Sequence, residues 1–383
     1  MIKRIIFILF FILNCAFFAQ ANDNSSKHNL TGHYKSLLVS TESNSSKEEL
    51  YALTNRLRLK YNYEYNENWQ VHLTVDNEVI VHDAGNTPDF DFTRSKQQNF
   101  TSTLDWDKVS SDTDHIYSRH SVYRAYIKYY TPEFQAVIGK QAIDWGKMRF
   151  YSPIDLFNSP GAIDIEHEER VGADAINLNF ALSDFSGVNL IYVPGDGDTN
   201  HSYGVKAYKT FGTYDISVIA AEVRKNLSFG LAFDGYVKQA GLRGEITHNI
   251  FENNREFTRF SVGVDYNIND KIYVLMEHFY NGGADDNNQA AFSSSFSTAR
   301  EIISLKKHLS SLWVEYKVTP LIDFNTYLVY DWEGESGVIN PELVYSLSES
   351  LDLTAGTQFF WGPALSEFGD YQNLYYVEII WYF

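Results

Sequence analysis

Apolar and polar residues alternate along most of this chain, and this period of two constrains the fold more than any other feature. Between Leu53 and Glu64 one parity is largely leucine and tyrosine, whereas the other carries arginine, lysine and asparagine. Such alternation is typical of a β-strand with one apolar and one polar face. The same pattern ends the chain, where one face of the last segment holds Tyr375, Val377, Ile379, Trp381 and Phe383.

The alternation predicts eighteen strands, with sixteen as the alternative count. Their approximate spans are 31–41, 50–65, 69–81, 118–130, 134–145, 170–181, 185–194, 202–210, 213–224, 226–236, 239–250, 256–268, 271–281, 308–318, 322–332, 338–348, 351–362 and 373–383. Every second connection is short and most of these contain turn residues. The long connections all fall between the others, at 82–117, 146–169, 282–307 and 363–372.

This one-sided sorting of the connections predicts a transmembrane, antiparallel, up-and-down β-barrel with short periplasmic turns and long extracellular loops. Lipid offers no hydrogen-bond partners, so a sheet within a membrane must close on itself. A soluble β-sandwich also alternates and is the competing interpretation, but it requires neither an even strand count nor long loops on one side only. A barrel of 16–18 strands is too wide for side chains to fill, so an aqueous channel is expected unless a loop plugs it.

The N-terminus has the pattern of a cleavable signal peptide. Lys3 and Arg4 precede a mostly apolar stretch at 5–18, and a small-x-small pattern ends at Ala21. We therefore predict a signal peptide over residues 1–21 and a single barrel domain from 22 to 383. A lipoprotein signal ending at Cys15 is the rival interpretation, and Asn14 just before it argues against that. A retained membrane helix is disfavoured, because about 20 apolar residues are needed for a span.

Composition narrows the possible functions. Cys15 is the only cysteine, so the chain after the signal peptide has none, which excludes disulfides, thiolate catalysis, cysteine-bound metal and covalent haem. The formal net charge is −18, which argues against nucleic acid as a partner. Aromatic residues make up 16% of the chain and its mean hydropathy is −0.30. Many aromatics without a long apolar run are typical of a membrane barrel.

Two stretches carry a resemblance to known proteins. The ending from Tyr375 to Phe383 resembles the C-terminal β-signal that the barrel-assembly machinery of Gram-negative bacteria reads. The segments IGKQAIDWG (138–146), PIDLFN (153–158) and EERVGAD (168–174) resemble a family of porin-like outer-membrane barrels of proteobacteria, mostly uncharacterised. The resemblance extends over most of the chain after the signal peptide. It implies a barrel fold and a location in the outer membrane, and it implies no substrate.

The long connection at 146–169 is the best candidate for a functional loop. It mixes apolar residues, which need burial, with charged ones, and free solvent buries nothing. One interpretation is that the loop folds into the lumen as a constriction whose charges line the narrowest point. The other is that it packs on neighbouring loops at the rim. Its candidate constriction residues are Lys147, Arg149, Asp155, Asp164, Glu168 and Glu169.

Strand parity assigns charged side chains to the inside of the barrel. The pore-lining candidates are Arg56, Arg58, Lys60, Arg124 and Lys128 on early strands, and Asp265, Glu277, Glu315, Asp323 and Asp331 on late strands. Opposite walls of opposite sign would create a transverse field across the water. The alternative is that these charges pair with cross-strand neighbours and keep the lumen open.

No stretch predicts catalysis, a metal or a cofactor. The acidic run at 166–169 surrounds one histidine and is typical of a solvated loop. The segment from 196 to 200 begins like a calcium loop but lacks the glycine and glutamate required at the sixth and twelfth positions. The histidines on predicted strands lie in no hydrolase signature, and nucleotide and haem motifs are absent from the sequence. We therefore predict that the protein is not an enzyme and binds no cofactor.

These observations together predict a porin-like channel for passive diffusion of small polar solutes or ions. The alternative is a barrel that acts as a sleeve or translocation component for a partner protein or a specific ligand. The expected partners are outer-membrane lipid and, during biogenesis, the barrel-assembly machinery. The solute, the ion selectivity and the oligomeric state stay open at this point.

Overall fold

Nineteen antiparallel strands dominate the computed structural model, which describes residues 27–43, 46–85, 104, 106–157, 172–195, 201–251, 255–284 and 304–383. The strands are β1 (His28–Glu42), β2 (Glu49–Asn66), β3 (Trp69–His82), β4 (Asp107–Asp112), β5 (Ile116–Tyr130), β6 (Phe134–Gln141), β7 (Ala173–Ser183), β8 (Ser186–Val193), β9 (Ser202–Phe211), β10 (Tyr214–Val223), β11 (Asn226–Val237), β12 (Ala240–Ile250), β13 (Glu256–Asn269), β14 (Ile272–Asn281), β15 (His308–Thr319), β16 (Ile322–Asp331), β17 (Ser336–Ser348), β18 (Leu351–Trp361) and β19 (Leu374–Tyr382). In these ranges no helix is both long and apolar enough to span a membrane.

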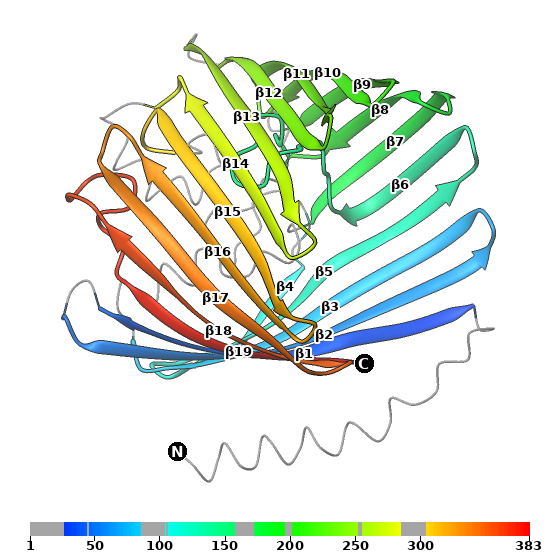
Figure 1. Ribbon diagram of the computed structural model, residues 1–383. Coiled ribbons are helices and arrows are strands. Elements are labelled where there is room, and N and C mark those ends of the chain that lie inside the picture. Colours follow the sequence, from blue (N-terminus) through cyan, green and yellow to red (C-terminus); the bar gives the residue numbers. More distant parts are fainter. Residues whose placement is uncertain are drawn as a thin grey trace.

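Each strand of the wall pairs with its neighbours in the chain, and β1 pairs with both β2 and β19, so the sheet closes on itself (Figure 1). Eighteen strands form this wall, which confirms the predicted fold and the predicted count. The nineteenth, β4, pairs with the part of β5 near its start and lies inside the predicted 82–117 connection. Sequence analysis missed β4 because its six residues, DKVSSD, contain only one large apolar side chain.

The connections differ in length between the two ends of the barrel. At one end, pairs such as β2–β3, β7–β8 and β17–β18 are joined by only two residues. At the other end lie the long connections that separate β3 from β5, β6 from β7, β14 from β15 and β18 from β19. Following the usual arrangement of outer-membrane barrels, we call the first end periplasmic and the second extracellular.

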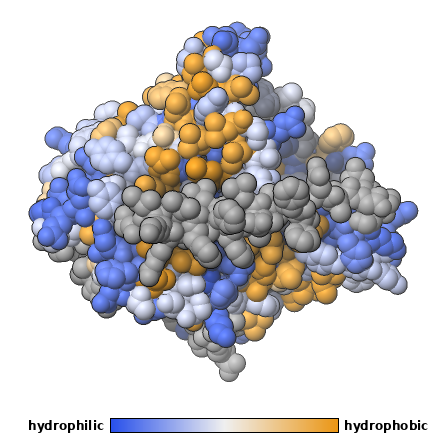
Figure 2. All heavy atoms as spheres, turned by 90° about the horizontal axis from the view of Figure 1, so that it is seen from below, coloured by the Kyte–Doolittle hydropathy of each residue, from blue (hydrophilic) through white to orange (hydrophobic). Residues whose placement is uncertain are grey.

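Large apolar side chains gather on the outer face of the wall. Val71 and Leu73 on β3, Val262 on β13 and Val377 on β19 are all exposed, while their sequence neighbours point inward. Figure 2 shows apolar residues concentrated on the outer face that forms the underside of Figure 1. This distribution matches a surface whose solvent is lipid, because an apolar side chain exposed to water contributes nothing to folding.

One polar residue interrupts the apolar face of β2, and the structure explains how it is tolerated. Asn55 shares the outer face with Tyr34 and Ser36 of β1, and its Oδ1 accepts hydrogen bonds from both hydroxyls, at 2.6 and 3.2 Å. A polar group in lipid is costly unless it is hydrogen-bonded. The small network therefore satisfies the amide oxygen of Asn55 where water is absent.

The seam of the barrel lies between β1 and β19. Beyond the paired strands, Gly32 and Phe383 exchange two backbone hydrogen bonds, of 2.9 and 3.0 Å. A Cβ added at Gly32 would clash with the backbone carbonyl oxygen of Arg58 on β2 and would lie 2.9 Å from Cζ of the Phe383 ring. Glycine is therefore required here for the last residue of the chain to pack over the first strand.

Candidate functional site

The segment that follows β6 leaves the wall and packs against the inside of the barrel (Figure 1). We call residues 142–157 the inner segment. Trp145, Ile154 and Phe157 are buried in a cluster with inward-facing residues of β7, β8, β10 and β11, and the Trp145 and Phe157 rings meet edge to face at 5.1 Å. The cluster gives the apolar residues of this segment the burial that free solvent lacks.

A second apolar cluster holds the middle of the inner segment against the late strands. Phe150 contacts Tyr327 of β16 with 5.8 Å between ring centroids, and Tyr151 stacks on Phe279 of β14 at 5.0 Å. Tyr327 and Phe279 are themselves almost completely buried. The two clusters together place the inner segment along the wall from β7 to β17, which is more than half of the barrel's circumference.

Two glutamates on the wall accept hydrogen bonds from the backbone of the inner segment. Glu245 of β12 accepts from the Lys147 N–H, from the Ser152 hydroxyl at 2.6 Å and from the Ile154 N–H at 3.5 Å. Its carboxylate is buried, with an exposed fraction of 3%. An irregular segment lacks the ladder bonds of a strand, so its amides need such partners. Bonds to a carboxylate are stronger than neutral ones.

Glu277 of β14 holds the next part of the inner segment in the same way. Its two carboxylate oxygens accept the N–H groups of Arg149 and Phe150, at 2.9 and 3.0 Å. On β13, between the two glutamates, the Ser261 hydroxyl donates to the carbonyl oxygen of Tyr151 at 2.6 Å. Three neighbouring strands thus fix the path of the inner segment through contacts to its backbone.

The charged side chains of the inner segment have different surroundings. The guanidinium of Arg149 lies 3.5 Å from the Trp313 ring centroid, and burial lowers its pKa although Glu315 and Glu277 lie nearby and raise it. Asp155 accepts the N–H groups of Trp145 and Gly146, at 3.3 and 3.2 Å, so it shapes the segment itself. Of the other predicted constriction residues, Lys147 lines the cavity described below. Asp164, Glu168 and Glu169 lie outside the described residues.

On the early wall the predicted pore-lining cations are paired with acids of the next strand. Arg56 donates to Glu78 at 2.9 Å, and Arg58 to Asp76 at 2.7 Å. The Arg58 guanidinium also lies 3.7 Å from the ring centroid of Tyr123. Cross-strand pairing, which sequence analysis left as the alternative, is therefore what the structure shows at these two arginines. The early wall has less net positive charge than the arginines alone suggest.

The remaining early candidates have aromatic neighbours. The guanidinium of Arg124 lies 4.4 Å from the Tyr123 ring centroid, and the ammonium of Lys128 lies 5.7 Å from that of Tyr130. Lys60 is half-buried on β2, opposite Thr74 of β3.

The late-wall acids have separate roles in the structure. Asp265 forms an ion pair with Arg243, and Glu277 holds the inner segment. Glu315 accepts the indole N–H of Trp313 at 2.8 Å, and Asp323 is exposed close to the periplasmic end. Asp331 is fully buried at the extracellular end. Its carboxylate accepts hydrogen bonds from the N–H groups of Glu333 and Gly334 and from the Ser336 hydroxyl. Glu245 was not among the predicted residues, although parity on β12 places it on the same face as Arg243.

The residues of the predicted assembly signal lie on β19 and at the chain's end. Tyr375, Val377 and Ile379 point outward and are exposed. The rings of Trp381 and Phe383 contact each other at 5.0 Å.

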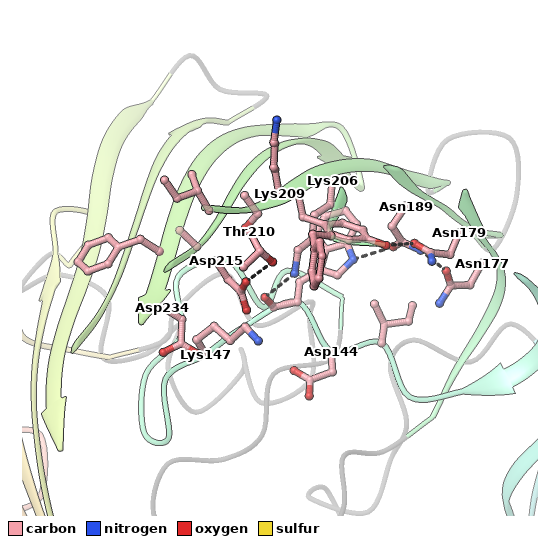
Figure 3. A pocket seen from close by; sticks show the side chains of 18 of the residues that line it. Asp144, Lys147, Asn177, Asn179, Asn189, Lys206, Lys209, Thr210, Asp215 and Asp234 are labelled. Carbon is pink, nitrogen blue, oxygen red and sulfur yellow. Dashed lines mark hydrogen bonds between the residues drawn. The ribbon is translucent and has the colours of Figure 1, made fainter. Parts of the chain in front are cut away.

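A cavity of about 390 Å³ opens between the inner segment and the periplasmic ends of β7 to β11 (Figure 3). Asp144, Trp145 and Lys147 bound it on the side of the inner segment, and Asp184 in the β7–β8 turn bounds it at the periplasmic end. Figure 3 shows the asparagines of β7 and β8 at one side of the cavity and Asp215 and Asp234 at the other. The cavity is thus part of the lumen below the inner segment.

Within the described ranges no group of three His, Asp or Glu side chains is placed to hold a metal ion. The acidic run at 166–169 and the segment from 196 to 200 lie outside those ranges.

Comparison with known proteins yields matches among solved structures only, since no protein-family model and no curated protein matches the chain. OccAB3 of Acinetobacter baumannii has a TM-score of 0.58 at 12% identity, covering 93% of this chain and 99% of that one. The outer membrane protein OprD of Pseudomonas aeruginosa has a TM-score of 0.58 at 10% identity, covering 95% of each. OccK8 (OprE) of the same species has a TM-score of 0.56 at 9% identity, covering 93% of this chain and 98% of that one.

The chain has the fold of an outer-membrane porin. In a porin fold of this strand number the lumen is wider than side chains can fill. The inner segment, the paired charges of the early wall and the cavity below the inner segment all lie within this lumen.

Proposed function

We propose that this protein is an outer-membrane channel for the passive diffusion of small polar solutes or ions. One observation carries the proposal: a closed wall of eighteen strands surrounds a lumen, the described inner segment packs against one part of that wall, and the early part of the wall carries charged side chains. A plug that filled the lumen would contact the whole circumference. The described inner segment contacts the wall from β7 to β17, and the early wall opposite it carries buried ion pairs.

The inner segment would act as the constriction of this channel. It narrows the lumen from one side, and both its buried apolar side chains and its backbone N–H groups fix it to the wall. A solute would therefore pass between this segment and the arginine-bearing strands β2 and β5. Side chains at such a narrow point determine which solutes enter, because there the solute loses most of its hydration shell.

The charges of the described lumen wall favour a weak preference for cations. Arg56 and Arg58 on the early wall are paired with Glu78 and Asp76, whereas Glu315 on the late wall accepts the neutral Trp313 indole and has the Arg149 guanidinium nearby. The chain as a whole has a formal net charge of −18. A net negative lumen raises the local concentration of cations.

Single-channel recording in planar bilayers tests the proposal. We expect discrete conductance steps from the purified, heat-modifiable barrel, and a reversal potential in a salt gradient that reports a modest cation preference. A folded barrel that inserts and shows no conductance would overturn the channel proposal and favour the sleeve for a partner protein.

The location and processing of the protein belong to the same proposal. We propose that residues 1–21 are removed during export and that the barrel is assembled in the outer membrane. Support comes from the n-region, the apolar stretch and the small-x-small pattern at Ala21, together with the porin fold. Mass spectrometry of the protein extracted from outer membranes should find an N-terminus at Asn22. We also propose that the protein has no enzymatic activity; among the strand histidines, His72 has both ring nitrogens in hydrogen bonds to Asn62 and Thr74.

A further inference from the structure

The cavity below the inner segment has a wall that is unusually rich in side-chain amides. Asn177 and Asn179 of β7 and Asn189 of β8 point into it, beside Tyr208 and Lys206 of β9 (Figure 3). Amides at a channel wall carry no charge, so they do not contribute to ion selectivity. They do offer fixed donors and acceptors to a polar solute.

Hydrogen bonds between these side chains orient the amides. The Trp145 indole donates to Asn189 Oδ1 at 2.9 Å, and Asn189 Nδ2 donates to Asn177 Oδ1 at 2.6 Å. The Tyr208 hydroxyl donates to Asn179 Oδ1 at 3.3 Å. In the described part of the chain, the Nδ2 groups of Asn177 and Asn179 donate to no protein atom. Both amides are thus held by their oxygen, and their N–H donors remain for a solute.

Charged groups of both signs surround the same cavity. Lys147 and Lys206 supply ammonium groups, and the Lys206 ammonium is held by the Trp145 carbonyl at 3.1 Å. Asp215 and Asp234 stand directly opposite each other on β10 and β11. A solute with a net charge is attracted by one set and repelled by the other. A neutral solute with several hydroxyls can accept from the lysines and amides and donate to the carboxylates, since each hydroxyl does both.

We propose that this cavity is a binding subsite for a neutral, polyhydroxylated solute of the size of a mono- or disaccharide. The proposal rests on the proposed function, because it requires that solutes reach the lumen. A volume of about 390 Å³ lies in the range of small-ligand sites. Because the cavity lies on the periplasmic side of the inner segment, a solute that enters from outside the cell would reach it after passing the constriction.

The test uses the full mature barrel in planar bilayers, with solutes added to the periplasmic side while the ion current is recorded. The probes are glucose and maltose, with gluconate as the anionic analogue and glucosamine as the cationic one. Tetraethylene glycol serves as a neutral probe that offers acceptors along its length but few donors. We expect saturable reduction of the current by glucose or maltose, at lower concentration than by the other three.

Substitutions identify the subsite. The double variant Asn177→Ser, Asn179→Ser removes the two free amides, and we expect it to weaken the block by sugar roughly 30-fold, which corresponds to two lost hydrogen bonds of about 1 kcal/mol each. Tyr208→Phe removes only one hydroxyl from the same cavity. It tests the subsite independently if the double variant does not fold. The matched control is Asn325→Ser on β16, a half-buried asparagine whose side chain bonds Glu342 at 3.5 Å, far from the cavity lining.

Each outcome decides the question. Saturable sugar block that the β7 variants weaken and Asn325→Ser leaves intact supports the subsite. Tighter block by gluconate or glucosamine, or equal block by tetraethylene glycol, overturns the assignment to neutral polyols. Normal conductance without any saturable block overturns the subsite and leaves the channel proposal standing. Absence of conductance overturns the channel proposal itself, and the subsite with it.

Discussion

Replacing Glu277 by alanine tests whether the wall holds the inner segment in place. The carboxylate accepts two backbone N–H bonds, from Arg149 and Phe150. A hydrogen bond to a charged group contributes about 1.5–3 kcal/mol, so the pair holds the segment by roughly 3 kcal/mol or more. Burial of the Phe150 ring, about 1.5–3 kcal/mol, remains. We therefore expect the segment to stay docked most of the time and to release about 100-fold more often.

Single-channel recording measures this release directly, as brief openings to a higher conductance that are rare in the unmodified protein. Glu315→Ala is the matched control, because it removes the same charge from the neighbouring strand, where the carboxylate bonds the Trp313 indole and no backbone group of the inner segment. Glu277→Gln retains one acceptor oxygen and should release less often than Glu277→Ala. If Glu277→Ala and Glu315→Ala gave the same records, the carboxylate would act through its charge alone and the reasoning would be refuted.

Three further predictions follow from other parts of the barrel. Arg58→Gln leaves the buried Asp76 carboxylate without its ion pair and should destabilise the barrel by about 3–5 kcal/mol; adding Asp76→Asn should restore most of the unfolding temperature, and no recovery would contradict the pairing. Burial raises the pKa of Glu367 to about 8, above its ordinary 4.5, so docking of its loop is favoured at acid pH and lost as the pH rises through 8. The N–H groups of Leu305 and Lys306 donate to Glu367, so tryptic cleavage after Lys306 should increase from pH 7 to pH 9, and Glu367→Gln should remove that increase; the same pH dependence in both proteins would count against this. Deleting Phe383 should lower the amount of folded barrel in the outer membrane while the precursor is still exported, and unchanged levels would show that this residue serves packing alone.

The strands were predictable because every second residue of a wall strand faces lipid and must be apolar, while the residues between them face the lumen. Lipid outside and water inside act on each strand of the wall, so even β12 and β13, which contain glycines, keep their alternation. The predicted β6, at 134–145, illustrates the limit. The strand ends at Gln141, because Ile143 and Trp145 leave the wall to pack inside it, and their parity alone does not reveal this change of role.

The position of the inner segment was only half predictable. Its apolar residues indicated burial, yet a rim position would have buried them too. Its apolar side chains pack inside the wall, and its backbone N–H groups bond to Glu245 and Glu277; backbone donors leave no trace in a sequence. The same applies to the early wall. Parity places Arg56 and Glu78 on one face of the sheet, but only the register of β2 against β3 shows that they meet.

The seam between the first and last strands has a consequence for how the protein is made. The pairing of β1 with β19 joins segments that are separated by nearly the whole chain, which is the most non-local contact that the topology contains. The inner segment depends on partners that lie 98 and 128 residues downstream. A chain that ends before Glu245 lacks both the closing contact and these anchors, and a chain that ends between Glu277 and β19 has the anchors but not the closing contact. The residues that narrow the lumen therefore precede the closing strand in the chain, so the wall can close only after its constriction and the partners of that constriction have been synthesised.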